Sequence, residues 1–195
     1  MADDGRTGEG VAAALKEQLL LFSFLVLFAG MISTDTYYAA FGLKYQFLDL
    51  STEHLIYRGV TALFGSAPLA LSYIAAVAWL SGIWPTLLGK HPEQRIRLNL
   101  ATYAVVAAVS VVAYFGAISA GRSSAAADLN AVGSRLPIVR SAKTAKGADL
   151  PLEGYRLLLS GKEWLALFKP GEGAAEVPFI HFMKRDEIGE LVISR

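Results

Sequence analysis

The chain has 195 residues, of which 54% are hydrophobic, and a formal net charge of +1. Its 18 basic residues are balanced by 17 acidic ones, so no excess positive charge is available to hold a nucleic-acid backbone. Cysteine is absent, which excludes disulfides, thiolate zinc sites and a cysteine nucleophile.

Hydrophobic residues are concentrated in three nearly uncharged runs, for which we predict transmembrane helices at about 19–41, 55–84 and 98–121. Each run reaches the ~20 residues that a helix needs to cross ~30 Å of hydrocarbon. The first run follows an acidic tail and is longer than the apolar core of a signal peptide, so we expect it to remain as a span. The predicted fold class is a membrane α-helical bundle of three transmembrane helices, joined to a small C-terminal domain.

The segments around the first two spans carry helix signals. Residues 1–18 are expected to form an N-terminal tail and a short interfacial helix. Ser51 is a plausible N-cap for the second helix, and the Glu53 carboxylate would lie at the positive end of its dipole. Pro68 is expected to kink this helix, because proline lacks a backbone donor.

Small residues recur at four-residue spacing in the third span. Such a face lets helix backbones approach closely, which matters in lipid because lipid provides no hydrophobic force between helices. The alternative is that alanine is simply frequent in this protein, and both readings stay open. The candidate helix-packing face comprises Ala113, Gly116, Ala117, Ala120 and Gly121.

Beyond the third span, residues 122–135 are predicted to be a linker and residues 136–195 a small β domain. Strands are expected at 136–142, 155–160, 163–168, 177–183 and 190–194. Gly161 and Lys162 are expected at the centre of a type II′ hairpin turn, and residues 184–189 should form one tight helical turn. This order predicts a small all-β domain, either an SH3-like or Sm-like barrel or a short antiparallel sheet.

Both faces of the predicted strands carry apolar side chains, so the β domain has more apolar surface than one core needs. A domain of about 60 residues is also marginal on its own. We therefore expect it to pack on copies of itself, on a partner or on the membrane surface.

A polar cluster lies between the first two apolar runs and comprises Asp35, Asp49, Glu53, His54 and Arg58. One reading is an intramembrane proton or ion path, because charges inside a membrane are costly and usually mark such paths. The other reading places these residues at headgroup level, beside an aromatic belt of Tyr37, Tyr38, Tyr45 and Tyr57. The span lengths favour the second reading. Arg58 is the best exception, because it is closest to the apolar run and could pair with Asp35 across the bundle.

Enzymatic motifs are not recognised. Glu53 and His54 do not form the HExxH pattern of zinc peptidases, and the three histidines, His54, His91 and His181, are far apart in the sequence. The Gly171–Gly173 run lacks the flanking elements of a phosphate-binding loop. We predict no catalytic residue, no cofactor and no metal site, and expect that the protein is not an enzyme.

Three spans followed by a small β domain, with an Ala- and Gly-rich third span, is a layout similar to that of small-conductance mechanosensitive channels. The chain departs from that family because its third-helix motif is not matched and the domain is too short for a full vestibule. The resemblance is therefore one of layout only.

Two functions remain open at this stage. The first is a non-catalytic membrane anchor or subunit whose β domain binds a partner or self-associates. The second is a small homo-oligomeric pore gated through that domain. The expected partners are the lipid bilayer and either further copies of the chain or another membrane protein, with no nucleic acid.

We expect a multi-pass protein of the plasma (inner) membrane. Basic residues near the span ends set orientation, and here they nearly balance, so the orientation is left open. One side would carry Arg6, Lys16, Lys90, Arg95 and Arg97, and the other Lys44, Arg58, Arg122, Arg135 and Arg140.

Overall fold

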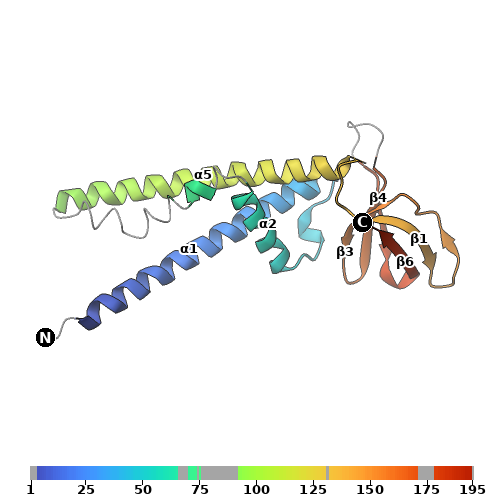
Figure 1. The fold of residues 1–195 in the computed structure, drawn as a ribbon, viewed down its shortest axis with the longest axis horizontal. Helices are drawn as coiled ribbons and strands as arrows, with labels where there is room; N and C mark the ends of the chain where they lie inside the picture. Colours follow the sequence, from blue (N-terminus) through green and yellow to red (C-terminus); the bar gives the residue numbers. More distant parts are fainter. Residues whose placement is uncertain are drawn as a thin grey trace. The chain divides into compact units, whose positions relative to one another are not determined.

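The computed structural model describes residues 4–65, 70–73, 75, 92–130, 132–170 and 178–194 (Figure 1). Contacts divide the chain into two compact units. The helical unit comprises Met1–Ser33 and Thr52–Ala120, and the sheet unit comprises Thr34–Ser51 and Gly121–Arg195. The last residues of two long helices therefore belong to the sheet unit.

The described helices are α1 (Asp4–Ala39), α2 (Thr52–Phe64) and α5 (Pro92–Leu129). The expected interfacial helix and the first expected span lie on one continuous helix, α1. As predicted, α2 begins directly after Ser51, with Glu53 in its first turn. The rest of the second expected span, including Pro68, lies mostly outside the described residues.

Helix α5 runs eight residues beyond the end expected for the third span, so residues 122–129 of the expected linker are helical. The sequence explains the extension, because this part contains three consecutive alanines and no proline or glycine after Gly121. Among the described residues, one helical stretch, Tyr103–Leu129, is long and apolar enough to cross a membrane. The crossing of the other two expected spans stays a prediction.

The sheet unit contains an antiparallel sheet that curls into a half-barrel, drawn in orange to red in Figure 1. Its strands are β1 (Ile138–Thr144), β2 (Asp149–Leu150), β3 (Arg156–Ser160), β4 (Trp164–Phe168), β5 (Ile180–Lys184) and β6 (Ile188–Ser194). The order is β2-β1-β3-β4-β5, and β6 pairs with β1. The five expected strands are present with shifted ends, and the short β2 was not predicted.

The tight turn expected before the last strand is a 3₁₀-helix at Arg185–Glu187. The hairpin between β3 and β4 is also present, but its centre was predicted one residue too early. The Gly161 N–H donates to the Trp164 carbonyl at 2.9 Å, which places Lys162 and Glu163 at the centre of the turn. Gly161 is therefore a flanking residue, paired directly opposite Trp164.

The two faces of the sheet bury different clusters. Neighbouring residues of β4 point to opposite faces, because side chains alternate along a strand. Leu167 packs inside the curl with Val139, Ala142 and Leu152. Ala166 and Phe168, on the outer face, instead join a core with residues from the ends of α1 and α5. The spare apolar face noted in the sequence is thus covered in part by residues 34–51 and 121–129 of the same chain.

Candidate functional site

The predicted polar cluster is divided between the two units. Asp35 and Asp49 belong to the sheet unit and are exposed, and Asp49 has a left-handed backbone with φ of 42°. Glu53, His54 and Arg58 lie on α2 in the helical unit.

Within α2, the charge of Arg58 affects the pKa of His54. Burial, and secondly the positive charge of Arg58, lowers the pKa of His54 from its usual value of 6.5. The two residues lie one helical turn apart on the same face, which explains why the guanidinium disfavours a second positive charge. The folded protein therefore favours a neutral imidazole at this position.

Across the described parts of the chain, no group of three or more acidic, histidine or cysteine side chains is arranged to hold a metal ion. His181 lies on β5, where its Nε2 is 3.3 Å from the Tyr155 hydroxyl. The two rings are in edge-to-face contact, with centroids 5.2 Å apart. His181 therefore has a packing and hydrogen-bonding role inside the sheet unit.

The predicted small face of α5 lies largely inside the protein. Ala113 and Ala117 are fully buried in the core of the helical unit, and Ala120 packs against them. Gly116 is half-buried, and Gly121 is buried within the sheet unit. In the described structure this face packs within the chain, alongside core residues of α1 and α2.

A closer backbone contact occurs at Gly30 on α1 and Gly59 on α2. A methyl group at Gly30 would overlap the carbonyl of Leu55, and one at Gly59 would overlap the carbonyl of Val26. Both helices therefore touch through their backbones, which only glycine permits. We call this contact of α1 and α2 the glycine crossing.

Sequence reasoning missed the glycine crossing, although a signal for it was present. Small residues occur four apart on α1, with Ala29 before Ser33 and Gly30 before Thr34, as in many close helix contacts in membranes. Ala29, Ser33 and Thr34 are all buried.

The second missed feature is an aromatic core in the sheet unit, which we call the helix–sheet junction. Tyr37 and Tyr38, at the end of α1, are almost completely buried there, so their assignment to an exposed aromatic belt was wrong. The Tyr37 ring lies 5.2 Å from the Phe41 ring, which in turn lies 5.1 Å from the Phe168 ring of β4. These aromatic contacts join the end of α1 to the outer face of the sheet.

Helix α1 ends in a glycine cap directly after these rings. Gly42 has φ of 73°, the Gly42 N–H donates to the Ala39 carbonyl at 3.0 Å, and the Leu43 N–H donates to the Tyr38 carbonyl at 3.0 Å. This is a Schellman motif, which ends a helix at a glycine with a left-handed backbone. The chain turns back at this point, and Leu43 and Leu48 pack against the junction.

Asp128, in the last turn of α5, is the polar centre of the junction. Its carboxylate accepts hydrogen bonds from the Tyr37 hydroxyl at 2.8 Å, the Arg135 backbone N–H at 3.1 Å and the Ser134 hydroxyl at 3.4 Å. Bonds to a charged acceptor are stronger than neutral ones. One carboxylate thus connects α1, α5 and the segment that leads into β1.

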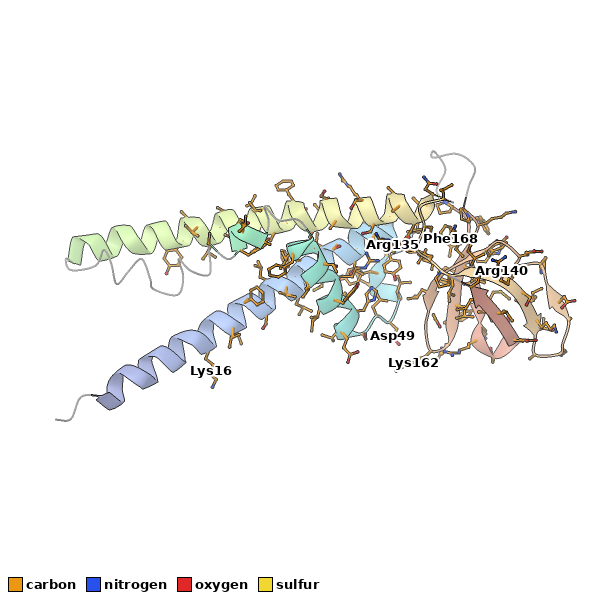
Figure 2. All side chains as sticks on the ribbon, viewed as in Figure 1. Lys16, Asp49, Arg135, Arg140, Lys162 and Phe168 are labelled. Carbon is orange, nitrogen blue, oxygen red and sulfur yellow. The ribbon has the colours of Figure 1, made fainter. Side chains whose placement is uncertain are left out.

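Arg156 of β3 holds the same segment from the other side. Its side chain is only 7% exposed, and its Nη1 donates to the Leu136 carbonyl at 3.1 Å and to the Ser134 carbonyl at 3.5 Å. Figure 2 shows Phe168 and Arg135 in the part of the sheet unit where these contacts lie. The polar groups of the junction form hydrogen bonds with one another and with the backbone, which indicates a structural role.

No protein-family model, curated protein or solved structure matches this chain.

Proposed function

We propose that the protein is a multi-pass integral membrane protein in which helices anchor a small C-terminal β domain that binds a partner or associates with its own copies. The role is a non-catalytic subunit. The observation that carries this proposal is the outward exposure of large apolar side chains on α1, α2 and α5 of the helical unit. The interior of that unit combines alanines and glycines with Leu63 and Tyr73.

The outward-facing side chains favour a lipid environment. On α1 they recur every three or four residues, so they form one stripe along the helix. Phe24 is 67% exposed and Phe115 of α5 is 62% exposed, which is unfavourable for a helix bundle in water. The set comprises Leu20, Phe24, Phe28 and Met31 on α1, Ile56, Val60 and Phe64 on α2, and Val111, Val112 and Phe115 on α5.

The proposed membrane is the plasma (inner) membrane, since outer-membrane proteins span the bilayer as β-barrels and this chain would use helices. The proposed β domain is an SH3-like or Sm-like barrel, on the basis of its strand order. In support, a 3₁₀ turn comes directly before the last strand, and that strand returns to pair with the first.

The test uses the absence of cysteine, because any introduced cysteine is the only thiol. Lys16→Cys on α1 and Lys146→Cys in the β1–β2 turn are both at exposed positions. In sealed vesicles, an impermeant maleimide should label each variant from one defined side, and the protein should stay in the membrane after alkaline carbonate extraction. Release of the protein by carbonate would contradict the proposal.

A separate measurement tests the partner role. Full-length protein in nanodiscs should run as a defined oligomer, or should co-purify with a fixed amount of one other protein after mild cross-linking. A monomer with no cross-linked product would contradict this part of the proposal.

The alternative function is a homo-oligomeric pore gated through the β domain. It is favoured by a second set of small residues on α5, because Ala104, Ala107 and Ala108 are exposed and could meet another copy. A pore predicts ion leakage from liposomes that contain only this protein, with the leak rising with protein loading. Absence of leakage at every loading would rule it out and leave the anchor.

A further inference from the structure

We propose that the outer face of the β4–β5 hairpin, formed by Trp164, Phe182 and Lys184, rests on the headgroup layer of the bilayer. We call this surface the hairpin face. The inference rests on the proposed function, because it requires that the helices cross a membrane. It goes further in naming a second, peripheral membrane contact within the sheet unit.

Strand register places the three residues on one face. Trp164 is paired with Lys184, Ala166 with Phe182, and Phe168 with Ile180. Residues directly opposite each other in an antiparallel pair share a face, and diagonal neighbours on that face lie within reach of long side chains. Trp164 and Phe182 are such diagonal neighbours, so they form a continuous apolar surface.

This surface continues the helix–sheet junction beyond the helices that cover it. Phe168 and Ala166 are fully buried beside Ala125 of α5 and Tyr38 of α1. Farther along the same face, Phe182 is 49% exposed and Trp164 is 44% exposed. Figure 2 shows Lys162, in the turn beside Trp164, at the other end of the strand from Phe168.

The position of the junction indicates what covers the exposed part. Helix α5 meets the outer face of the sheet at Ala125, within the Tyr103–Leu129 stretch that is suited to cross a membrane. The last turns of α5 belong to the sheet unit, so this outer face lies beside the end of the helix that is proposed to cross the membrane. The hairpin face continues the same surface, which makes the headgroup layer its proposed cover.

The residue types also suit a headgroup layer. The Lys184 ammonium lies 5.5 Å from the centre of the Trp164 ring, as in a cation–π contact. Tryptophan is enriched at membrane interfaces, where its ring is partly apolar and its N–H can reach water. Lysine can bury its aliphatic stem and keep its charge in water.

The charges near the hairpin face are mixed. Lys162 and Arg185 lie close in sequence to Glu163 and Asp186, and all four are exposed. The contact should therefore depend on the interfacial aromatic residues more than on anionic lipid. Zwitterionic phosphatidylcholine is sufficient as the test membrane.

The experiment uses the full-length chain in phosphatidylcholine vesicles, with one spin label per variant. Phe182→Cys reports the hairpin face, Lys146→Cys reports the distant β1–β2 turn, and Phe115→Cys reports the exposed side of α5. Power saturation with oxygen, which partitions into lipid, and with a water-soluble nickel chelate measures the surroundings of each label. We expect lipid contact at positions 115 and 182 and water contact at position 146.

Three other results of the spin-label experiment would each contradict a specific part of the account. Lipid contact at 115 with water contact at 182 overturns the hairpin-face proposal and leaves the membrane anchor intact. Water contact at 115 overturns the proposed function itself. Low accessibility of 182 to both reagents, with spin–spin broadening that disappears on dilution with unlabelled protein, shows that a second copy covers the face and also overturns the proposal.

A second measurement avoids any change in the hairpin face. In the variant Trp79→Phe/Trp84→Phe, Trp164 is the only tryptophan. Lipid brominated near the headgroup end of the acyl chains should quench its fluorescence strongly, and aqueous iodide should quench it weakly. Strong iodide quenching with no effect of brominated lipid overturns the proposal even where the Phe182→Cys protein fails to fold.

Discussion

The helical unit and the sheet unit differ in the make-up of their interiors. In the helical unit alanines and two glycines make up much of the interior beside Leu63 and Tyr73, while Phe24 and Phe115 face outward. In the sheet unit the interior holds Tyr37, Phe41 and Phe168. Large apolar side chains are placed inside where water is the solvent, because burial then removes apolar area from water.

In lipid that gain disappears, since the surroundings are as apolar as the side chains. Close backbone contact becomes the available source of attraction, and small residues provide it. The difference between the two interiors is what the proposed membrane location of the helices predicts. Four predictions test the packing of the two units, in order of decreasing expected effect.

Phe168→Ala should destabilise the sheet unit most. The Phe168 ring is fully buried against Phe41, and truncation of such a ring leaves a cavity that costs about 3–5 kcal/mol. Thermal unfolding of the purified protein, followed by the circular dichroism of the strands, measures the loss. Phe182→Ala on the half-exposed hairpin face is the matched control and should cost roughly 1 kcal/mol or less. Equal losses would mean that the junction is not a packed core.

Gly30→Ala should destabilise the helical unit, although it adds only one methyl group. That group would overlap the Leu55 carbonyl, and overpacking of a close contact costs about 1–3 kcal/mol or more. The helical signal in thermal unfolding measures the change. Met31→Ala, at the neighbouring exposed position, should have little effect in detergent. A Gly30→Ala protein as stable as the parent would disprove the glycine crossing.

Tyr37→Phe should remove the hydroxyl bond to Asp128 and keep the ring in place. A hydrogen bond to a partly buried carboxylate contributes about 1–2 kcal/mol. Tyr45→Phe, which removes a tyrosine hydroxyl at the edge of the same core, is the matched control and should cost less. A double-mutant cycle of Tyr37→Phe with Asp128→Asn should show coupling between the two residues. Strict additivity would show that the bond does not contribute.

The smallest effect concerns His54 and pH. Because its pKa is lowered in the folded protein, the unfolded chain binds a proton first as the pH falls through 6.5. Stability should therefore be complete at higher pH and should decrease as the pH falls below 6.5 toward the lowered folded value. His54→Gln should remove this dependence, and Arg58→Gln should reduce it. Thermal midpoints between pH 7.5 and about 5, above the range of most carboxylates, measure the slope. A slope unchanged by His54→Gln would refute the assignment.

Local patterns in the sequence predicted local features well. The two apolar runs Tyr155–Ser160 and Glu163–Phe168, with a short glycine-containing connection, predicted a hairpin, and Ser51 with Glu53 predicted the start of α2. The position of the turn was missed by one residue, because a glycine is compatible with either the centre or the flank of a turn.

Features that depend on contacts distant in the sequence were not predictable in the same way. From the sequence alone, a tyrosine at the end of an apolar helix is predicted to be an interfacial anchor. For Tyr37 the contacts that bury it include Asp128, which is 91 residues away. Likewise, Gly30 and Gly59 are single glycines whose meaning appears only when the two helices cross. The polar cluster shows the converse, since its five residues are close in sequence but divided between two units.

The segments before and after β1 should differ in how well they tolerate inserted residues. Between α5 and β1, Asp128 and Arg156 hold successive backbone groups, so an inserted residue there would break several bonds together. In the β1–β2 turn, Gly147 has open space around it and its N–H donates only to the nearby Thr144 carbonyl, 2.8 Å away. A fluorescent reporter or affinity tag inserted after Lys146 should therefore leave the fold intact, which makes this turn the natural attachment point for imaging and purification.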